Sequence, residues 1–594
     1  MHLPRRALSF VFAGGSAIIA GALATNVLFA DGGQALDYVR IALLSLSVAW
    51  LAWGAAIGFN GIFAIDPKPA PHRDPEPDSR EPGRVAVLVP VYNEDPVKTF
   101  SHVAAMAASV GATASPGRFD FIVLSDTTSD LIARQEAAWF ERLERETPVA
   151  GRLYYRRREA NVGKKAGNIA DFIRTSGGHY EFLVILDADS LMEGATMVEM
   201  VRRMEAEPRL GLLQSLPKIV RARSFFGRAV QFAASYYSPS FARGISTMQG
   251  EEGPFWGHNA VVRTRAFAQS CGLPTLSGRP PFGGHVLSHD YVEAALLARN
   301  GWIVRLDTDL EGSFEEGPEN IIDYAKRDRR WCQGNLQHSR IVAAPGLKPW
   351  SRFTLVQGIM AYLASPLWAI FLAVSLVASA TIGEPDYFPT PDMPAVFPRV
   401  EMVQALLLMG GVATVLIGPK FLILARGLVT GGNRGFRGTL VSAASVVVEI
   451  VWSSVLAPIM LMFQTRSVFQ VLAGLDGGWP ASNREAGSVS LREAWDASWW
   501  ICATGFAVMA ATMKFAPDLY YWLLPVCVPL MAAPLLIAVT SASNRRSLLF
   551  SVPTEMTKPR IMREQEAVLA RWRGMNEQPV TEAEAGPARA ATAR

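Results

Sequence analysis

The stretch FLVILDAD, Phe182–Asp189, is an apolar run of strand length that ends in two aspartates one residue apart. Such a run is typical of a buried parallel strand, where charge appears only as the strand leaves the sheet. Ligands bind beyond the carboxyl ends of strands in open α/β sheets. The pair Asp187 and Asp189 at such an edge favours Mg²⁺ or Mn²⁺, and with it a diphosphate substrate. The alternative is a solvated turn, in which aspartate is common.

Three other strand-like stretches precede this one, with helical patterns between them. They are Val85–Val91, Phe121–Leu124 and Arg152–Arg157. Strands that alternate with helices predict a parallel sheet with right-handed crossovers. Asp126 follows the second stretch, so we expect it at the same edge of the sheet as Asp187 and Asp189.

Composition and missing motifs exclude several other classes of protein. No Gly-x-Gly-x-x-Gly follows the first strand and no Walker A motif is present, so neither a dinucleotide-binding Rossmann domain nor a P-loop is supported. The 57 basic and 53 acidic residues give a net charge of +4, and we expect no nucleic-acid partner. The four cysteines form neither a disulfide framework nor a zinc pattern.

Half of the 594 residues are hydrophobic, which fits a membrane protein with a soluble domain. The apolar stretches Leu8–Ala30 and Ile41–Ile65 predict two transmembrane helices within residues 1–65. A signal peptide is the alternative, but the first stretch is too long for a typical cleaved one. Residues 66–84 form a proline-rich linker, and flanking basic residues place the following domain, residues 85–345, in the cytoplasm.

Residues 346–545 predict a second transmembrane bundle with interfacial helices. The candidate spans are Thr354–Ile382, Met402–Ala425, Leu440–Phe463, Ala494–Met513 and Tyr520–Ser541. The acidic loop Gly383–Val400 should lie outside, yet five crossings conflict with a basic C-terminal segment that should lie inside. We therefore expect Leu440–Leu475 to hold two crossings or a re-entrant pair around Pro458.

Two further features lie in or after this bundle. Glu449 is either a functional intramembrane carboxylate or a charge satisfied between helices, and both interpretations stay open. Residues 546–594 are expected to form a cytoplasmic tail, with an amphipathic helix beyond about Thr557 and then a disordered segment rich in Ala, Glu and Thr.

The second half of the soluble domain holds three polar motifs. They are Phe255–Asn259, Gly283–Asp290 and Arg327–Trp331. The histidines His258, His285 and His289 are possible metal ligands. The arginine run is either a solvated face or, with a tryptophan directly after it, a platform for an anion.

Together these residues resemble the processive family-2 glycosyltransferases, the group that contains cellulose and hyaluronan synthases. The matching segments are Pro90–Glu94, Asp126, Lys165–Asn168, Asp187–Asp189, Asp290 and Arg330–Trp331. Leu287–Ala294 and Ser313–Asn320 are most similar to bacterial inner-membrane synthases of the β-1,2-linked backbone of osmoregulated periplasmic glucans. The resemblance implies a GT-A-like α/β domain, with a mixed and mostly parallel sheet, inserted in an α-helical transmembrane bundle.

The resemblance also implies a role for each matching residue in an inverting transfer from UDP-glucose to a growing glucan. Asp290 is the expected base, and Asp187 and Asp189 are the expected ligands of Mg²⁺ or Mn²⁺. The nucleotide-binding residues are Tyr92, Glu94, Asp126, Lys165 and Arg330, and the acceptor-binding residues are Trp331, His258 and Asn259. Arg327 stands where this superfamily usually has Gln, which puts the acceptor contact of that Gln in doubt.

The expected partners are UDP-glucose, the growing glucan and the lipid bilayer. The resemblance adds acyl carrier protein, although no motif in the sequence marks a surface for it. Another membrane polysaccharide synthase, with a different linkage or sugar, is the alternative enzyme. The alternative without enzymatic activity is a transporter or scaffold that senses a nucleotide-sugar, but such a protein needs no acceptor-side base.

Overall fold

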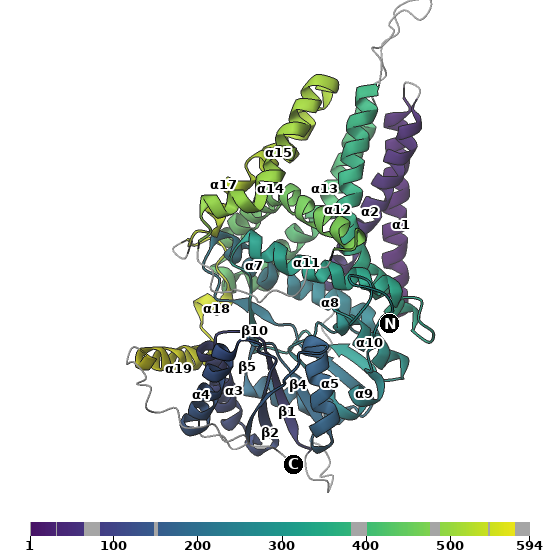
Figure 1. The fold of residues 1–594 in the computed structure, drawn as a ribbon. Helices are drawn as coiled ribbons and strands as arrows, with labels where there is room; N and C mark the ends of the chain where they lie inside the picture. The colour runs from purple at the N-terminus through teal and green to yellow at the C-terminus, as the bar shows by residue number, and fades with distance from the viewer. Residues whose placement is uncertain are drawn as a thin grey trace, which may run out of the picture.

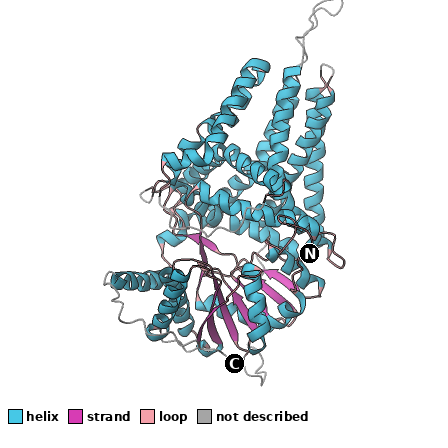
Figure 2. Cartoon of the chain, viewed as in Figure 1, coloured by secondary structure: helices cyan, strands magenta, loops and turns pink. Residues whose placement is uncertain are grey.

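The computed structural model describes residues 2–30, 33–64, 83–147, 152–381, 401–475, 488–544 and 547–576. The predicted linker lies almost wholly outside these residues, as do the acidic loop before Val400 and the end of the tail. In Figure 1 a sheet domain occupies one end of the molecule and long helices project from the other. Figure 2 shows that the strands are confined to the first of these parts.

A seven-stranded mixed sheet forms the centre of the domain. Its order is β3 (Leu153–Arg157), β2 (Phe119–Ser125), β1 (Val85–Val91), β4 (Phe182–Ile185), β8 (Ala260–Arg263), β6 (Leu210–Gln214) and β9 (Ile303–Leu306). Only β8 is antiparallel to its neighbours. A smaller sheet has the order β5 (Leu191–Met192), β10 (Ser313–Glu316) and β7 (Lys218–Val220). The mixed and mostly parallel sheet predicted from the sequence is therefore confirmed.

The register of β2, β1 and β4 brings their carboxyl ends to one edge. Leu88 pairs with Ile185, and Val91 pairs with Ser125. Backbone hydrogen bonds continue past the strand ends, from Asp126 N to Val91 O at 2.9 Å and from Leu186 N to Leu88 O at 3.1 Å. Asp126 and Asp187 therefore leave the sheet on the same side, as the parallel crossovers predicted.

Helices flank the sheet and place the polar motifs at this edge. α3 (Pro96–Gly111) follows β1, and the Asp95 side chain caps it by accepting from Val97 N at 3.0 Å. α4 (Asp130–Glu146), α5 (Lys164–Ser176) and α6 (Gly194–Ala206) complete the first half of the domain. α10 (His289–Arg299) and α11 (Ile321–Gln337) carry the later motifs.

The last described helix, α19 (Arg560–Asn576), packs against α3 beside the sheet (Figure 1). Trp572 is fully buried, and its ring centroid lies 5.2 Å from that of Trp139 in α4. Its indole N–H donates to Glu146 at 2.7 Å. An amphipathic helix thus begins close to where the sequence predicted one, and its apolar face completes the core of the sheet domain.

Five helices are long and apolar enough to cross a membrane among the described residues. They are α1 (His2–Leu28), α2 (Ala35–Ile62), α12 (Pro349–Thr381), α13 (Met402–Thr430) and α14 (Thr439–Leu472). A sixth candidate is the bent pair Pro517–Met531 and Ala533–Ser541, whose two parts meet at 57°. α15 (Leu491–Phe515) precedes this pair.

The expectation of two crossings or a re-entrant pair in Leu440–Leu475 is wrong. α14 is one continuous helix of 34 residues, and Pro458 lies inside it without ending it. The bend occurs instead between α16 (Tyr520–Met531) and α17 (Ala533–Ser541). Several prolines lie close to this break. Because a proline lacks the backbone N–H and clashes with the preceding helical turn, several of them close together explain the bend.

The contacts of Glu449 show whether it is a functional carboxylate or a charge satisfied between helices. The Lys420 ammonium lies 2.7 and 2.9 Å from the two carboxylate oxygens, and the Tyr237 hydroxyl donates to one of them at 3.1 Å. Glu449 is therefore a buried charge satisfied by its neighbours. The structural interpretation is favoured over a functional one.

A close helix crossing joins the N-terminal membrane hairpin to the sheet domain. α8 (Ser238–Gln249) lies against α2, and both helices have a glycine at the crossing. A β-carbon on Gly61 would lie 1.7 Å from Ser240 O, and one on Gly244 would lie 1.9 Å from Ile57 O. Only residues without a side chain let these two backbones approach so closely.

We expect Gly61→Ala and Gly244→Ala each to force α2 and α8 apart and to destabilise the protein by about 1–3 kcal/mol, as overpacking does. The measurement is the apparent Tm of the detergent-solubilised protein. Gly54→Ala is the matched control, because a β-carbon there meets nothing within 4 Å in the same helix. Equal Tm values for the three variants would contradict the close crossing.

Candidate active site

A cavity of about 300 Å³ opens at the carboxyl edge of the large sheet. Nine of the eleven residues assigned from the sequence line it: Tyr92, Glu94, Asp126, Lys165, Asp187, His258, Asp290, Arg330 and Trp331. Asp189 and Asn259 are not among the lining residues. Segments separated by more than two hundred residues in the chain therefore meet in one cleft.

The first wall of the cavity is formed by the ends of β1 and β2. Glu94 accepts a hydrogen bond from Tyr92 N, which folds the Tyr92–Glu94 segment back on itself. Asp126 is almost fully buried, and Arg158 donates to its two oxygens at 2.7 and 2.8 Å. This bidentate pair neutralises a carboxylate that would otherwise repel a diphosphate. Sequence reasoning missed Arg158, although the arginine run at the end of β3 was a signal for it.

The second wall is the turn after β4. Lys165, in the first turn of α5, forms a close ion pair with Asp187 and donates to Gly257 O at 2.8 Å. Asp189 is half-buried and close enough to Glu315 to affect it electrostatically. Burial raises the pKa of Glu315, and the negative charges of Asp189 and Asp187 raise it further against the opposing effect of His258 and Arg327. Glu315 was also missed, because nothing in its sequence context places β10 here.

The donor set at this turn fits a metal that a substrate helps to hold. No group of three or more His, Cys, Asp or Glu side chains able to hold a metal occurs within the described ranges. Mg²⁺ is commonly bound by one or two carboxylates, with substrate phosphates and water as its other ligands. Asp187 and Asp189 suit that arrangement, whereas the histidine ligands considered from the sequence gain no support.

Asp290 lies in the first turn of α10, next to Gly257 across the cavity. A β-carbon on Gly257 would be in van der Waals contact with the Asp290 carboxylate, 3.5 Å away, and the φ of this glycine, 83°, disfavours any side chain there. Burial raises the pKa of Asp290; neighbouring His289 opposes this effect and Glu293 adds to it. His289 Nδ1 in turn lies 2.9 Å from the Glu293 carboxylate.

The third wall is the exposed face of α11. Trp331 keeps 42% of its surface exposed, and the Arg327 guanidinium lies 4.4 Å from the centre of its ring. These residues are one helical turn apart, so the residue that replaces the usual Gln covers part of the tryptophan face. Arg330 lines the cavity from the same helix.

Asn259, which the sequence predicted to contact the acceptor, is not among the residues that line the cavity. Its side chain is fully buried, accepts from Ser190 Oγ at 2.6 Å and donates to Ser313 Oγ at 2.8 Å. It therefore ties the turn after β4 to β10, beneath the cavity. His258, its neighbour, does line the cavity and lies 3.5 Å from Glu315.

The chain is similar to known proteins over most of its length. Residues 86–270 match the family model for glycosyl transferase family 2, and residues 182–417 match that for glycosyl transferase family group 2. Glucans biosynthesis glucosyltransferase H from Cereibacter sphaeroides is 54% identical over 91% of this chain and 91% of its own length. The protein of the same name from Shewanella sp. (strain ANA-3) is 39% identical over 96% of this chain and 80% of its own.

Among solved structures, a mannosyltransferase from Pyrobaculum calidifontis in complex with GDP-Man and Mn²⁺ matches with a TM-score of 0.46 and 16% identity. The match covers 74% of this chain and 99% of that one.

The family matches identify the sheet domain as the GT-A-like fold predicted from the sequence, and family-2 enzymes of this fold generally use divalent metals. The relatives also establish hexosyl transfer as the class of reaction. The chain therefore belongs to glycosyltransferase family 2, and within it to the family of glucans biosynthesis glucosyltransferase H.

Proposed function

We propose that the protein transfers glucose from UDP-glucose to the hydroxyl of a growing glucan, building a linear β-1,2-linked backbone of osmoregulated periplasmic glucans processively. The observation that most supports this proposal is the single cavity shared by Asp126, Asp187 and Asp290. A nucleotide, a metal-bound diphosphate and an acceptor need polar groups at three points of one cleft, and these residues supply them. The name shared by the curated relatives supports glucose as the sugar.

In this proposal the uridine lies against the first wall of the cavity. Tyr92, Glu94 and Asp126 contact the nucleoside, with Asp126 held in place by Arg158. Lys165 and Arg330 meet the phosphates, which suits an ammonium and a guanidinium that line the same cavity.

Asp187 and Asp189 would hold Mg²⁺ or Mn²⁺ on the diphosphate. When bound, the metal offsets the negative charge that develops on the departing diphosphate oxygen. Lys165 now pairs with Asp187, so it would exchange this carboxylate for a phosphate when the nucleotide-sugar enters.

Asp290 acts as the base. Its carboxylate takes the proton of the acceptor hydroxyl as that oxygen attacks the anomeric carbon from the face opposite the diphosphate. The bond from carbon to the diphosphate oxygen breaks, and its electron pair leaves with UDP. One displacement inverts the anomeric centre, and no covalent intermediate is expected.

Trp331 offers a flat apolar face to the terminal glucose of the acceptor, with His258 beside it. The basic residues that flank the apolar helices favour a cytoplasmic catalytic domain in the bacterial inner membrane. An active site beside a helix bundle would let the product move outward as it lengthens. Acyl carrier protein stays a proposed partner on resemblance alone.

The linkage of the product separates this proposal from its alternative. Purified protein incubated with radiolabelled UDP-glucose and Mg²⁺ is expected to release UDP and form a β-1,2-glucan, identified by linkage analysis. A polymer of another linkage, or incorporation only from a different UDP-sugar, would instead indicate another membrane polysaccharide synthase.

Asp290→Asn is expected to lower kcat by about 10²–10⁴-fold, the usual contribution of a general base. The amide keeps the shape of the side chain but cannot accept the proton, so binding of UDP-glucose should change little. Single-turnover transfer and equilibrium binding of UDP-glucose measure the two effects separately. Normal turnover in this variant would remove Asp290 from the role of base.

Asp189→Ala is expected to abolish the metal-dependent part of UDP binding, because one of two carboxylates is lost from the site. Calorimetric titration of UDP, with and without Mn²⁺, measures this part directly. Asp309→Ala is the control, since Asp309 is a surface carboxylate paired with Arg203 outside the cavity. A binding curve that the mutation leaves unchanged would contradict the metal role.

A further inference from the structure

A buried histidine lies directly behind the turn that joins Asp187 to Asp189. His102, in α3, is almost completely buried, and its Nδ1 lies 3.2 Å from the carbonyl oxygen of Ala188. Its Nε2 lies 3.3 Å from Nη1 of Arg221. His102 does not line the cavity, so none of the roles described above uses it.

The two partners of His102 fix its tautomer. A guanidinium can only donate and a carbonyl can only accept, so Nε2 accepts from Arg221 and Nδ1–H donates to Ala188 O. Burial lowers the pKa of His102 to about 4, which keeps the ring neutral at pH 7. One ring nitrogen therefore holds the turn, while the other is anchored by Arg221.

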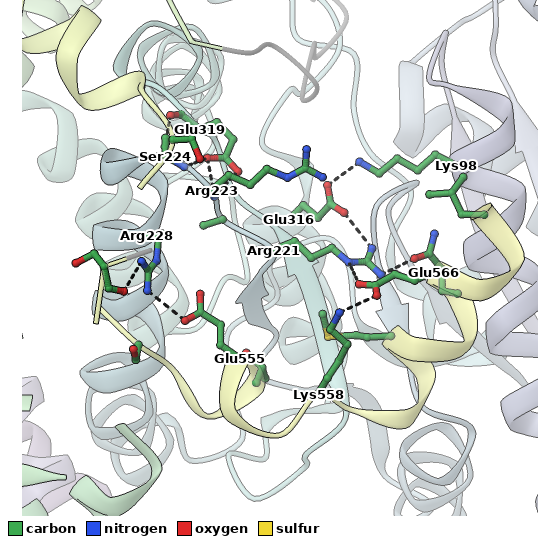
Figure 3. Close-up of a pocket in the computed structure, with 18 of the residues that line it drawn as sticks. Lys98, Arg221, Arg223, Ser224, Arg228, Glu316, Glu319, Glu555, Lys558 and Glu566 are labelled. Atoms are coloured by element: carbon green, nitrogen blue, oxygen red, sulfur yellow. Dashed lines mark hydrogen bonds and ion pairs between the residues drawn. The ribbon is translucent and has the colours of Figure 1, made fainter. Parts of the chain in front are cut away.

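Arg221 is itself fixed from several directions (Figure 3). Its Nη1 donates to Glu316 at 3.2 Å, and Glu316 also accepts from Lys98 at 2.7 Å. Burial alone would raise the pKa of Glu316, but the neighbouring cations outweigh it and the pKa falls to about 2. Arg221 has a φ of 66°, a left-handed conformation that is uncommon for a residue with a side chain. Such strain persists only where the surroundings hold the residue firmly.

The remaining contacts of Arg221 come from the C-terminal helix α19. Nη2 donates to the amide oxygen of Gln565, and Nε lies 3.7 Å from Glu566. The amide nitrogen of Gln565 donates to Ser101 Oγ at 2.7 Å, one residue before His102. Figure 3 shows Arg221 between Glu316 on one side and Glu566 on the other. A continuous set of hydrogen bonds thus runs from α19 to the backbone between the two aspartates.

We infer that His102 and Arg221 are positioning residues, which hold the Asp187-Ala188-Asp189 turn in the geometry that binds the metal-diphosphate, and that Gln565 of α19 completes their support. This inference rests on the proposed metal role of the turn. Carboxylates that share a metal with substrate phosphates must be held within a fraction of an ångström. Replacing the groups that hydrogen-bond to such ligands commonly changes metal affinity 10–100-fold. A residue that only supports the fold would lower the amount of folded protein without changing that affinity.

The test compares two replacements of His102 of similar size. His102→Leu removes both hydrogen bonds, whereas the amide N–H of His102→Asn can still donate to Ala188 O. We expect His102→Leu to raise the Mn²⁺ concentration for half-maximal UDP binding at least tenfold, and His102→Asn to recover most of this loss. Calorimetric titration of the full-length protein in detergent measures both.

His338→Leu is the matched control. His338 is also fully buried, and its Nε2 lies 2.9 Å from Ser288 O at the start of α10, not from the turn after β4. It should lower Tm as His102→Leu does but leave the Mn²⁺ requirement unchanged. If His102→Leu does not fold, Arg221→Met and Gln565→Ala remove the anchor without touching the turn. Both are expected to raise the Mn²⁺ requirement.

The outcomes separate this inference from the proposed function. If Asp189→Ala leaves the Mn²⁺ requirement unchanged, the metal role of the turn is wrong and the inference falls with it. If Asp189→Ala abolishes metal-dependent binding while folded His102→Leu or Arg221→Met binds Mn²⁺ as the wild type does, the positioning role alone is overturned.

Discussion

The structure depends on an electrostatic constraint at one edge of the sheet. Parallel register brings the carboxylates of Asp126 and Asp187 to the same side, and like charges in a partly dehydrated cleft repel strongly. Arg158 and Lys165 offset this repulsion with direct ion pairs. The cleft can therefore concentrate acidic groups for chemistry and still be stable without a ligand.

Much of the fold followed from sequence because its signals are local. The apolar runs and the helices between them predicted parallel strands, and that pattern alone brought Asp126 to the edge that carries Asp187. Residues brought in by tertiary contacts escaped this reasoning. Glu315 enters from a short strand of the second sheet, and Asn259 turns beneath the cavity, where three hydroxyl and backbone partners satisfy it.

The membrane half shows the same limit. Hydropathy located the apolar helices, but it does not say which proline bends a helix. Pro458 is accommodated within α14, whereas the chain bends between α16 and α17, where several prolines fall close together. The partners of Glu449 are Lys420 of α13 and Tyr237, the residue before α8. Both are distant from Glu449 in the chain, so the sequence alone did not identify them.

The position of α19 affects the order in which the protein can be assembled. Trp572 packs beside Trp139, yet α12, α13, α14 and the bent pair α16 and α17 all lie between these two residues in the chain. During synthesis the face formed by α3 and α4 stays uncovered until the ribosome has passed the last apolar segment. The sheet domain therefore completes its core only after the bundle has been translated, and a chain that stops early leaves apolar surface open to aggregation or proteolysis.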